Sequence, residues 1–197
     1  MIRTSGIKDS ASIVTAIWLV SFADFVLPGA GLSFLGIVPR EISGLLGIVC
    51  SAFIHGSLSH LVSNTPSLFF LLMLLSLGER RNRFWLVVVF GIIGSGAMTW
   101  MLSSGGRVVG ASGLVFVLIG YLLANCMFNP NQRSLPIGLI TIVVFGGSVV
   151  SMHHFAPQIS LSAHFGGLVA GVVLAKVLGG ILVSDEKTLD PNSLKFV

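Results

Sequence analysis

Six apolar runs recur along the chain, and each is long enough to cross a lipid bilayer as a helix. A hydrocarbon core of about 30 Å takes about 20 helical residues, or about 17 at the short limit. Only 9% of the 197 residues are charged, whereas soluble domains contain about 25%. The sequence therefore predicts an all-α membrane protein, a bundle of six transmembrane helices. The runs lie near residues 11–28, 57–77, 84–103, 110–128, 135–152 and 160–183.

Two further stretches complete the predicted organisation. Residues 29–56 are too apolar for a solvated linker and too interrupted by glycine and proline to span, so we expect a long interfacial loop. Residues 184–197 are polar, and we expect a poorly ordered cytoplasmic tail after a membrane domain of residues 1–183.

The basic residues predict the orientation. With six spans both termini share one side, which then carries eight Lys and Arg residues, while the other side carries only Arg40 and Arg107. Cytoplasmic loops are enriched in Lys and Arg, so we expect both termini in the cytoplasm. Without an organellar presequence or soluble appendage, we expect a prokaryotic plasma membrane protein. The eight are Arg3, Lys8, Arg80, Arg81, Arg83, Arg133, Lys187 and Lys195.

Four polar side chains fall at a similar depth beneath the external face. His60 and Asn64 lie one helical turn apart near the start of the second run, Ser112 begins the fourth, and His164 lies near the start of the sixth. Polar and ionisable groups at membrane depth are costly and mark functional sites by default. This shared depth predicts a site that opens to the external face.

The chemistry of these groups favours nucleophilic catalysis. A serine hydroxyl needs a base to take its proton, and histidine, with a pKa of about 6.5, suits neutral pH. Gly110 and Gly113 flank Ser112 and leave its hydroxyl uncovered, so we expect a dyad of Ser112 and His164. A small-residue packing motif is the other reading of Ser112.

Spacing on the fourth and sixth runs predicts that the two helices approach closely. Gly167 and Gly171 follow His164 on nearly the same side of the sixth run, and Ala175 and Gly179 continue the row. Phe116 lies one turn after Ser112, where it can pack against the imidazole ring.

Attack on an amide creates an oxyanion that needs hydrogen-bond donors. Asn64 offers an amide NH2, His60 a ring N–H, and Ser112 its backbone N–H at a helix N-terminus. Capping or tethering of the external loop is a competing role for His60 and Asn64, and both roles can coexist. We expect His55 to brace this loop.

Three motifs in order resemble the signature regions of rhomboid intramembrane serine proteases, over about residues 10–183. The motifs are HGSLSHLVSN (55–64), GASG (110–113) followed by Gly120-Tyr121, and AHFGGLVAG (163–171). The resemblance implies a rhomboid-like bundle and a Ser112–His164 dyad that cleaves transmembrane segments of membrane proteins. It also implies that His60, Asn64 and the Ser112 N–H form the oxyanion hole.

The sequence departs from this family at two places. Pro39-Arg40-Glu41 stands where many members have a Trp-Arg pair, and Phe116 stands where many have tyrosine. Neither departure removes a reacting group.

Other functions fit less well. A catalytically silent rhomboid-like binder of membrane segments is the main alternative. A transporter is disfavoured because the polar groups share one depth, and we expect Asp24, near the outer end of its run, to be hydrated.

Adjacent His153 and His154 do not share a helix face, so we expect no metal and no cofactor. Dispersed basic residues argue against nucleic acid. The oligomeric state is not indicated.

Small residues in the fifth run predict loose packing. Gly138, Gly146, Gly147 and Ser148 offer little side-chain surface to a neighbouring helix. We expect this helix to move aside and admit a substrate helix.

Overall fold

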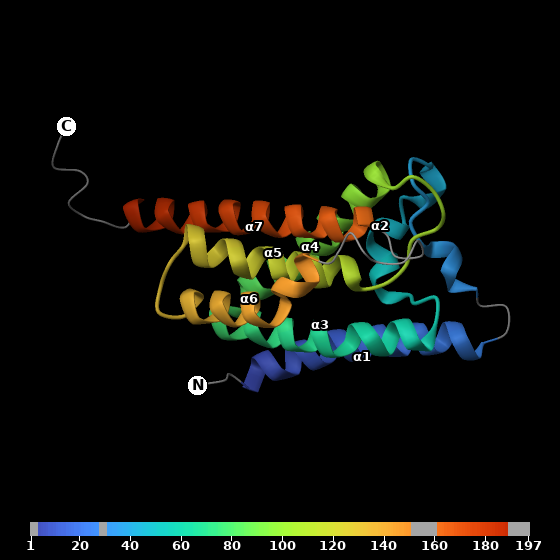
Figure 1. The fold of residues 1–197 in the computed structure, drawn as a ribbon, viewed down its shortest axis with the longest axis horizontal. Coiled ribbons are helices and arrows are strands. Elements are labelled where there is room, and N and C mark those ends of the chain that lie inside the picture. Colours follow the sequence, from blue (N-terminus) through green and yellow to red (C-terminus); the bar gives the residue numbers. More distant parts are fainter. Residues whose placement is uncertain (1–3, 28–30, 151–160, 189–197) are drawn as a thin grey trace.

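The computed structural model describes residues 4–27, 31–150 and 161–188, and this part of the chain is helical apart from one isolated β-bridge (Figure 1). The long helices are α1 (Thr4–Val26), α3 (Leu58–Gly78), α4 (Arg81–Leu102), α5 (Ser112–Phe128), α6 (Ser134–Val150) and α7 (Leu161–Thr188). The prediction of an all-helical protein is confirmed. The last residues of the fifth predicted run, the start of the sixth, and residues 189–197 lie outside the described residues.

Two helix ends differ from the prediction. Helix α1 begins at Thr4, well before residue 11, because its polar first turns have partners: Gly6 packs closely against Ser76, and Asp9 pairs with Arg81 at 2.8 Å. Helix α7 continues to Thr188, so the first residues of the predicted tail are helical. Extending an existing helix adds a hydrogen bond for each residue fixed.

In the part of the chain that the structure describes, four helices are long and apolar enough to cross a membrane: α1, α3, α4 and residues Leu161–Gly179 of α7. Helices α5 and α6 are apolar but have 17 residues each. Helix α5 is the central helix, because it packs against α3, α4, α6 and α7 and almost all of its side chains are buried. A short helix can therefore occupy the middle of the bundle without reaching both membrane surfaces by itself.

Successive long helices run in opposite directions through the bundle (Figure 1). Helices α3, α5 and α7 begin at one end, together with the segment that links α1 to α3; we call this the loop end. Helix α1 begins and α7 ends at the opposite end, the termini end. The predicted site residues near the starts of α3, α5 and α7 therefore share the loop end.

Residues 31–57 contain only short helical turns, as the interrupted sequence predicts. They are the 3₁₀ turns η1 (Leu32–Leu35), η2 (Ile42–Gly44) and η3 (Ser51–Phe53) and the one-turn helix α2 (Gly47–Cys50). This segment is fastened to α4: the Trp100 indole donates to the Glu41 carbonyl at 2.9 Å, and Gly96 allows the Ile48 backbone to approach. Residues 31–57 are thus part of the packed structure.

Asp24 makes a contact that the sequence did not predict. Its carboxylate accepts a hydrogen bond from the Leu32 N–H at 2.5 Å, where η1 begins. Hydration of the remaining carboxylate oxygen stays a prediction.

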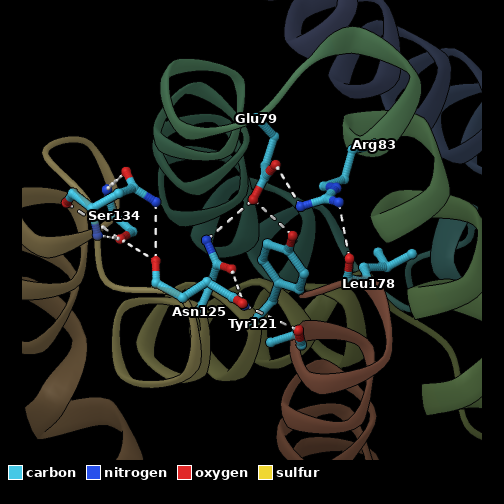
Figure 2. Close-up of polar contacts among 9 residues, drawn as sticks. Glu79, Arg83, Tyr121, Asn125, Ser134 and Leu178 are labelled. Atoms are coloured by element: carbon cyan, nitrogen blue, oxygen red, sulfur yellow. Dashed lines mark hydrogen bonds and ion pairs between the residues drawn. The ribbon is translucent and has the colours of Figure 1, made fainter. Parts of the chain in front are cut away.

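A buried polar cluster joins four helices at the termini end (Figure 2). The Tyr121 hydroxyl and the Asn125 amide donate to one Glu79 oxygen at 2.8 and 3.1 Å, and Arg83 lies 3.6 Å from the other oxygen. Arg83 also donates to the Leu178 carbonyl at 2.9 Å. Since these residues come from the end of α3, from α4, α5 and α7, the cluster fixes the spacing of all four. Burial raises the pKa of Glu79, against the opposing effect of the Tyr121 hydrogen bond and the Arg83 charge.

We expect Glu79→Ala to lower the melting temperature in detergent micelles strongly. It leaves the Tyr121 hydroxyl and the Asn125 amide without their acceptor, and each buried unsatisfied group costs about 1–3 kcal/mol. Glu79→Gln retains an acceptor oxygen and should melt closer to wild type. Glu41→Ala, which removes an exposed carboxylate bound to Ser43, is the control. Equal melting of Glu79→Ala and this control would contradict the role of the cluster.

The same variants test the pH dependence. A carboxyl whose pKa is raised on folding stabilises the fold most below its unfolded pKa, and this contribution is lost as pH rises through the folded pKa. Wild type should therefore lose stability relative to Glu79→Gln as the pH rises above about 4.5. The same change of melting temperature with pH in both proteins would contradict this expectation.

Candidate active site

The residues before α5 are held by backbone hydrogen bonds from the α1–α3 segment. Ile37 and Val108 exchange two N–H to carbonyl bonds of 2.9 Å, and the Gly110 N–H donates to the Ser51 carbonyl at 2.9 Å. Gly110 has a φ angle of 123°, a backbone conformation that residues other than glycine rarely adopt. The chain turns sharply there, and Ser112 becomes the first residue of α5.

The N-terminus of α5 is suited to an anion. Ala111 precedes the helix and makes no side-chain cap. The first backbone N–H groups of a helix lack acceptors within the helix and lie at the positive end of its dipole. The Ser112 N–H belongs to this set, and its role as a donor stays a prediction.

Helix α7 brings His164 to the first turn of α5. Side chains at Gly167 and Gly171 would collide with the Gly113 and Val117 carbonyls of α5, so the two backbones pack directly against each other. His164 is buried, with 3% of its surface exposed, and its ring stacks on Phe116 at 4.3 Å between centroids and 17° between planes. The predicted small-residue contact and the predicted packing of Phe116 on the imidazole are both confirmed.

His60 approaches the same region from α3, and Asn64 lies one turn further along that helix. A Cβ atom built on Gly110 would lie 2.6 Å from His60 Cε1 and 3.0 Å from Nε2, so the ring lies directly against the turn before Ser112. The Asn64 Nδ2 group is buried and has no hydrogen-bond partner within the described residues. A buried donor without an acceptor is costly and needs an explanation. Ligand binding at this position provides one.

A small cavity adjoins Ser112. It is lined by hydroxyl-bearing residues from three segments, including Ser51, Ser95 and Thr99, and by Gly113. Most of the other lining residues are apolar, but these hydroxyl groups offer hydrogen-bond partners to a water molecule. The site therefore combines a hydroxyl, an imidazole close to the same helical turn, an unpaired amide donor and a place for water.

Two residues, His55 and Ser21, support the site, and only Ser21 was not singled out from the sequence. His55 is fully buried: its Nε2 accepts from the Ala111 N–H at 3.3 Å, and its Nδ1 lies 3.0 Å from the hydroxyl of Ser21 on α1. The expected bracing role of His55 is confirmed by these contacts. Ser21 was missed, although a polar residue inside an apolar run is a signal that deserves a search for its partner.

Metal binding has no support in the described part of the chain. Within residues 4–27, 31–150 and 161–179, no three His, Cys, Asp or Glu side chains come together as ligands would. His153 and His154, which were considered as metal ligands, lie outside those ranges.

Comparisons with known proteins agree with this arrangement. The Rhomboid domain family model matches residues 43–181. The chain belongs to the rhomboid family. An uncharacterised protein of Mycobacterium tuberculosis is 31% identical over 187 residues, which cover 89% of this chain and 78% of that protein. RHOMBOID-like protein 5 of Arabidopsis thaliana is 36% identical over 140 residues, covering 66% of this chain and 43% of that protein. Rhomboid-related protein 3 of Homo sapiens is 27% identical over 158 residues, covering 74% of this chain and 38% of that protein.

The structure shows which contacts are made at the two places where this rhomboid departs from the expected family pattern. Around Pro39-Arg40-Glu41 the loop is held by backbone contacts, because the Arg40 N–H donates to the Trp100 carbonyl at 3.1 Å and the Trp100 indole bonds Glu41. Phe116 contacts His164 through the face of its ring. Stacking needs no phenolic hydroxyl, so phenylalanine suffices for this contact.

The close contact of α5 and α7 is tested by a pair of glycine substitutions. Gly171→Ala inserts a methyl group against the Val117 carbonyl and Tyr121 nitrogen, whereas Gly147→Ala on α6 meets no atom of the described residues within 4 Å. Overpacking costs about 1–3 kcal/mol, but alanine in an open helical position is favourable by about 0.5–1 kcal/mol. We expect a clear fall in melting temperature for Gly171→Ala and none for Gly147→Ala. Equal behaviour of the two variants would argue against direct backbone packing.

Proposed function

We propose that this rhomboid is an intramembrane serine endopeptidase that hydrolyses peptide bonds in transmembrane segments of other membrane proteins. Ser112 is the nucleophile and His164 is the general base. The observation that carries the proposal is the stacking of His164 on Phe116, one turn from Ser112 on the same helix. Family membership adds support, since the three motifs lie within the matched or adjoining residues.

The reaction follows from these roles. The Ser112 Oγ attacks the substrate carbonyl carbon while His164 takes its proton, and a tetrahedral oxyanion forms. The Ser112 N–H, the Asn64 amide and the His60 ring N–H stabilise this charge. His164 then protonates the leaving amine, and an acyl-enzyme remains. A water molecule attacks the ester, His164 takes its proton, and the Ser112 hydroxyl is regenerated. The hydroxyl-lined cavity beside Ser112 is a suitable source of that water.

The same proposal includes six membrane passes with the loop end outside. A helix of 17 residues is about 26 Å long at 1.5 Å per residue, close to the short limit for a span. Arg80, Arg81, Arg83 and Arg133 lie at the termini end, in agreement with a cytoplasmic location for both termini. We propose a prokaryotic plasma membrane as the location and membrane proteins as the substrates.

A fluorophosphonate probe tests the nucleophile directly. Wild-type protein in micelles should be labelled, and Ser112→Ala should not, because the probe needs an activated hydroxyl. His164→Ala should reduce cleavage of a membrane protein substrate by about 10⁴-fold or more. Ser12→Ala, whose hydroxyl bonds only the Asp9 carbonyl within α1, is the matched control and should behave as wild type.

Two outcomes would count against the protease. Equal labelling of wild type and Ser112→Ala would reject the nucleophile. Binding of a transmembrane peptide without cleavage, across several substrates and lipids, would favour a silent binder.

Substrate entry beside α6 is a further expectation of the proposal. Gly138 packs tightly against Cys126, contrary to uniformly loose packing, whereas a Cβ atom built on Gly147 would meet no atom of the described residues within 4 Å. We expect the half of α6 nearer the loop end to be the half that moves. Phe70 of α3 and Phe145 of α6 contact each other, with ring centroids 6.1 Å apart, and mark the seam to be opened.

We expect a crosslink across this seam to slow cleavage of membrane substrates. Phe70→Cys and Phe145→Cys, in a background with Cys50 and Cys126 replaced by alanine, can be joined by a short bifunctional maleimide. Labelling of Ser112 by the small fluorophosphonate should be unchanged, because the probe does not need a helix-sized opening. Unchanged cleavage of membrane substrates would indicate entry at another seam.

A further inference from the structure

We propose that Ser21 on α1 and His55 before α3 are positioning residues for Ser112, joined to it by one hydrogen-bonded chain that neither substrate nor probe touches. The inference rests on the proposed function and extends it to α1. The chain runs from the Phe53 carbonyl through the Ser21 hydroxyl and the His55 ring to the Ala111 N–H, the backbone donor immediately before Ser112.

The donors and acceptors allow only one arrangement of protons. The Ala111 N–H can only donate, so His55 Nε2 must be the unprotonated acceptor, at 3.3 Å. Nδ1 of the neutral ring then carries the proton and donates to Ser21 Oγ at 3.0 Å. The Ser21 hydroxyl donates its own hydrogen to the Phe53 carbonyl at 3.0 Å. The Ala111 N–H determines the His55 tautomer, and the Ser21 hydroxyl oxygen accepts the remaining His55 proton while its own hydrogen goes to the Phe53 carbonyl.

The surroundings keep the His55 ring neutral. Ser21 and His55 are both fully buried. Burial, together with the nearby His60 at 5.1 Å between ring centroids, lowers the pKa of His55 to about 4. A neutral ring at physiological pH can accept from Ala111, whereas a protonated ring would present a second donor to it.

The series of hydrogen bonds holds the peptide that leads into α5 in one position. The Gly110 N–H is held by the Ser51 carbonyl at 2.9 Å, and the next N–H, that of Ala111, is held by His55. Two successive anchored amides, after the positive φ of Gly110, define where α5 starts and hence where Ser112 places its Oγ and N–H. A displacement of about 1 Å at a reacting group can cost about 100-fold in rate.

Attachment of α1 to the bundle does not depend on Ser21. The Trp18 indole donates to Thr65 Oγ1 on α3 at 2.9 Å, and Asp9 pairs with Arg81 at the other end of α1. Removing the Ser21 hydroxyl should therefore disturb the His55 ring more than the position of the helix. This separates a positioning role from a purely structural one.

The experiment measures the concentration dependence of fluorophosphonate labelling, with the full chain in micelles. This gives a maximal rate of inactivation and a separate half-saturating concentration. We expect Ser21→Ala to lower the maximal rate about 10- to 100-fold, with the half-saturating concentration and melting temperature close to those of the Ser12→Ala control on the same helix. An unchanged maximal rate in Ser21→Ala, with labelling still dependent on Ser112, would overturn this inference alone.

A second pair of variants gives an independent test should Ser21→Ala fail to fold. His55→Gln retains an oxygen that can accept from the Ala111 N–H, whereas His55→Leu has a similar volume and no acceptor. The maximal rate should be lower for His55→Leu than for His55→Gln by about 10-fold or more. Equal rates would reject the positioning role of His55. Labelling of Ser112→Ala at the wild-type rate would instead overturn the proposed function, and this inference with it.

Discussion

Direct backbone contact between α5 and α7 is the interaction on which the rest of the structure depends. Gly167 and Gly171 of α7 pack against α5 carbonyls, and Gly120 of α5 packs against the Leu168 backbone in return. Burial from water does not drive helices together within lipid, so close van der Waals packing of small residues takes that role. This contact places His164 beside the turn that Ser112 begins, and any larger side chain in the row would move the two helices apart.

The two ends of α5 are held by different kinds of interaction. At the termini end, Glu79 accepts hydrogen bonds from both Tyr121 and Asn125, so these buried polar side chains serve as one another's partners. At the loop end, the entering backbone is held by a β-bridge, by Ser51 and by His55, while the buried Asn64 donor has no partner among the residues that the structure describes. Fully paired polar groups stabilise a fold, whereas an unpaired buried donor is typical of a site that binds something. The contrast separates the structural end of the molecule from its candidate site.

Hydropathy located the helices well and located their polar contacts poorly. The predicted runs agree with most helix bounds because each depends on the composition of one continuous stretch. Asp9 and Arg81 are 72 residues apart, Glu79 and Tyr121 are 42 apart, and Ser21 and His55 are 34 apart. No local pattern relates such residues, so the early start of α1, the cluster at Glu79 and the part played by Ser21 were not foreseen. His164 and Phe116 were predicted to meet because a row of small residues follows His164 on the sixth run and Phe116 lies one turn after Ser112 on the fourth.

The sequence alone determined the all-helical, membrane-spanning class, the family and the residue types available for chemistry, since these follow from composition and from motifs read in order. The tertiary structure alone decided which side chains meet. It stacked His164 on Phe116, set His60 against Gly110, and tied Ser21 through His55 to the amide before Ser112. The physical reason is that these contacts depend on how far apart the helix axes lie and how each helix is rotated. Both are set by packing among α1, α3, α5 and α7 together.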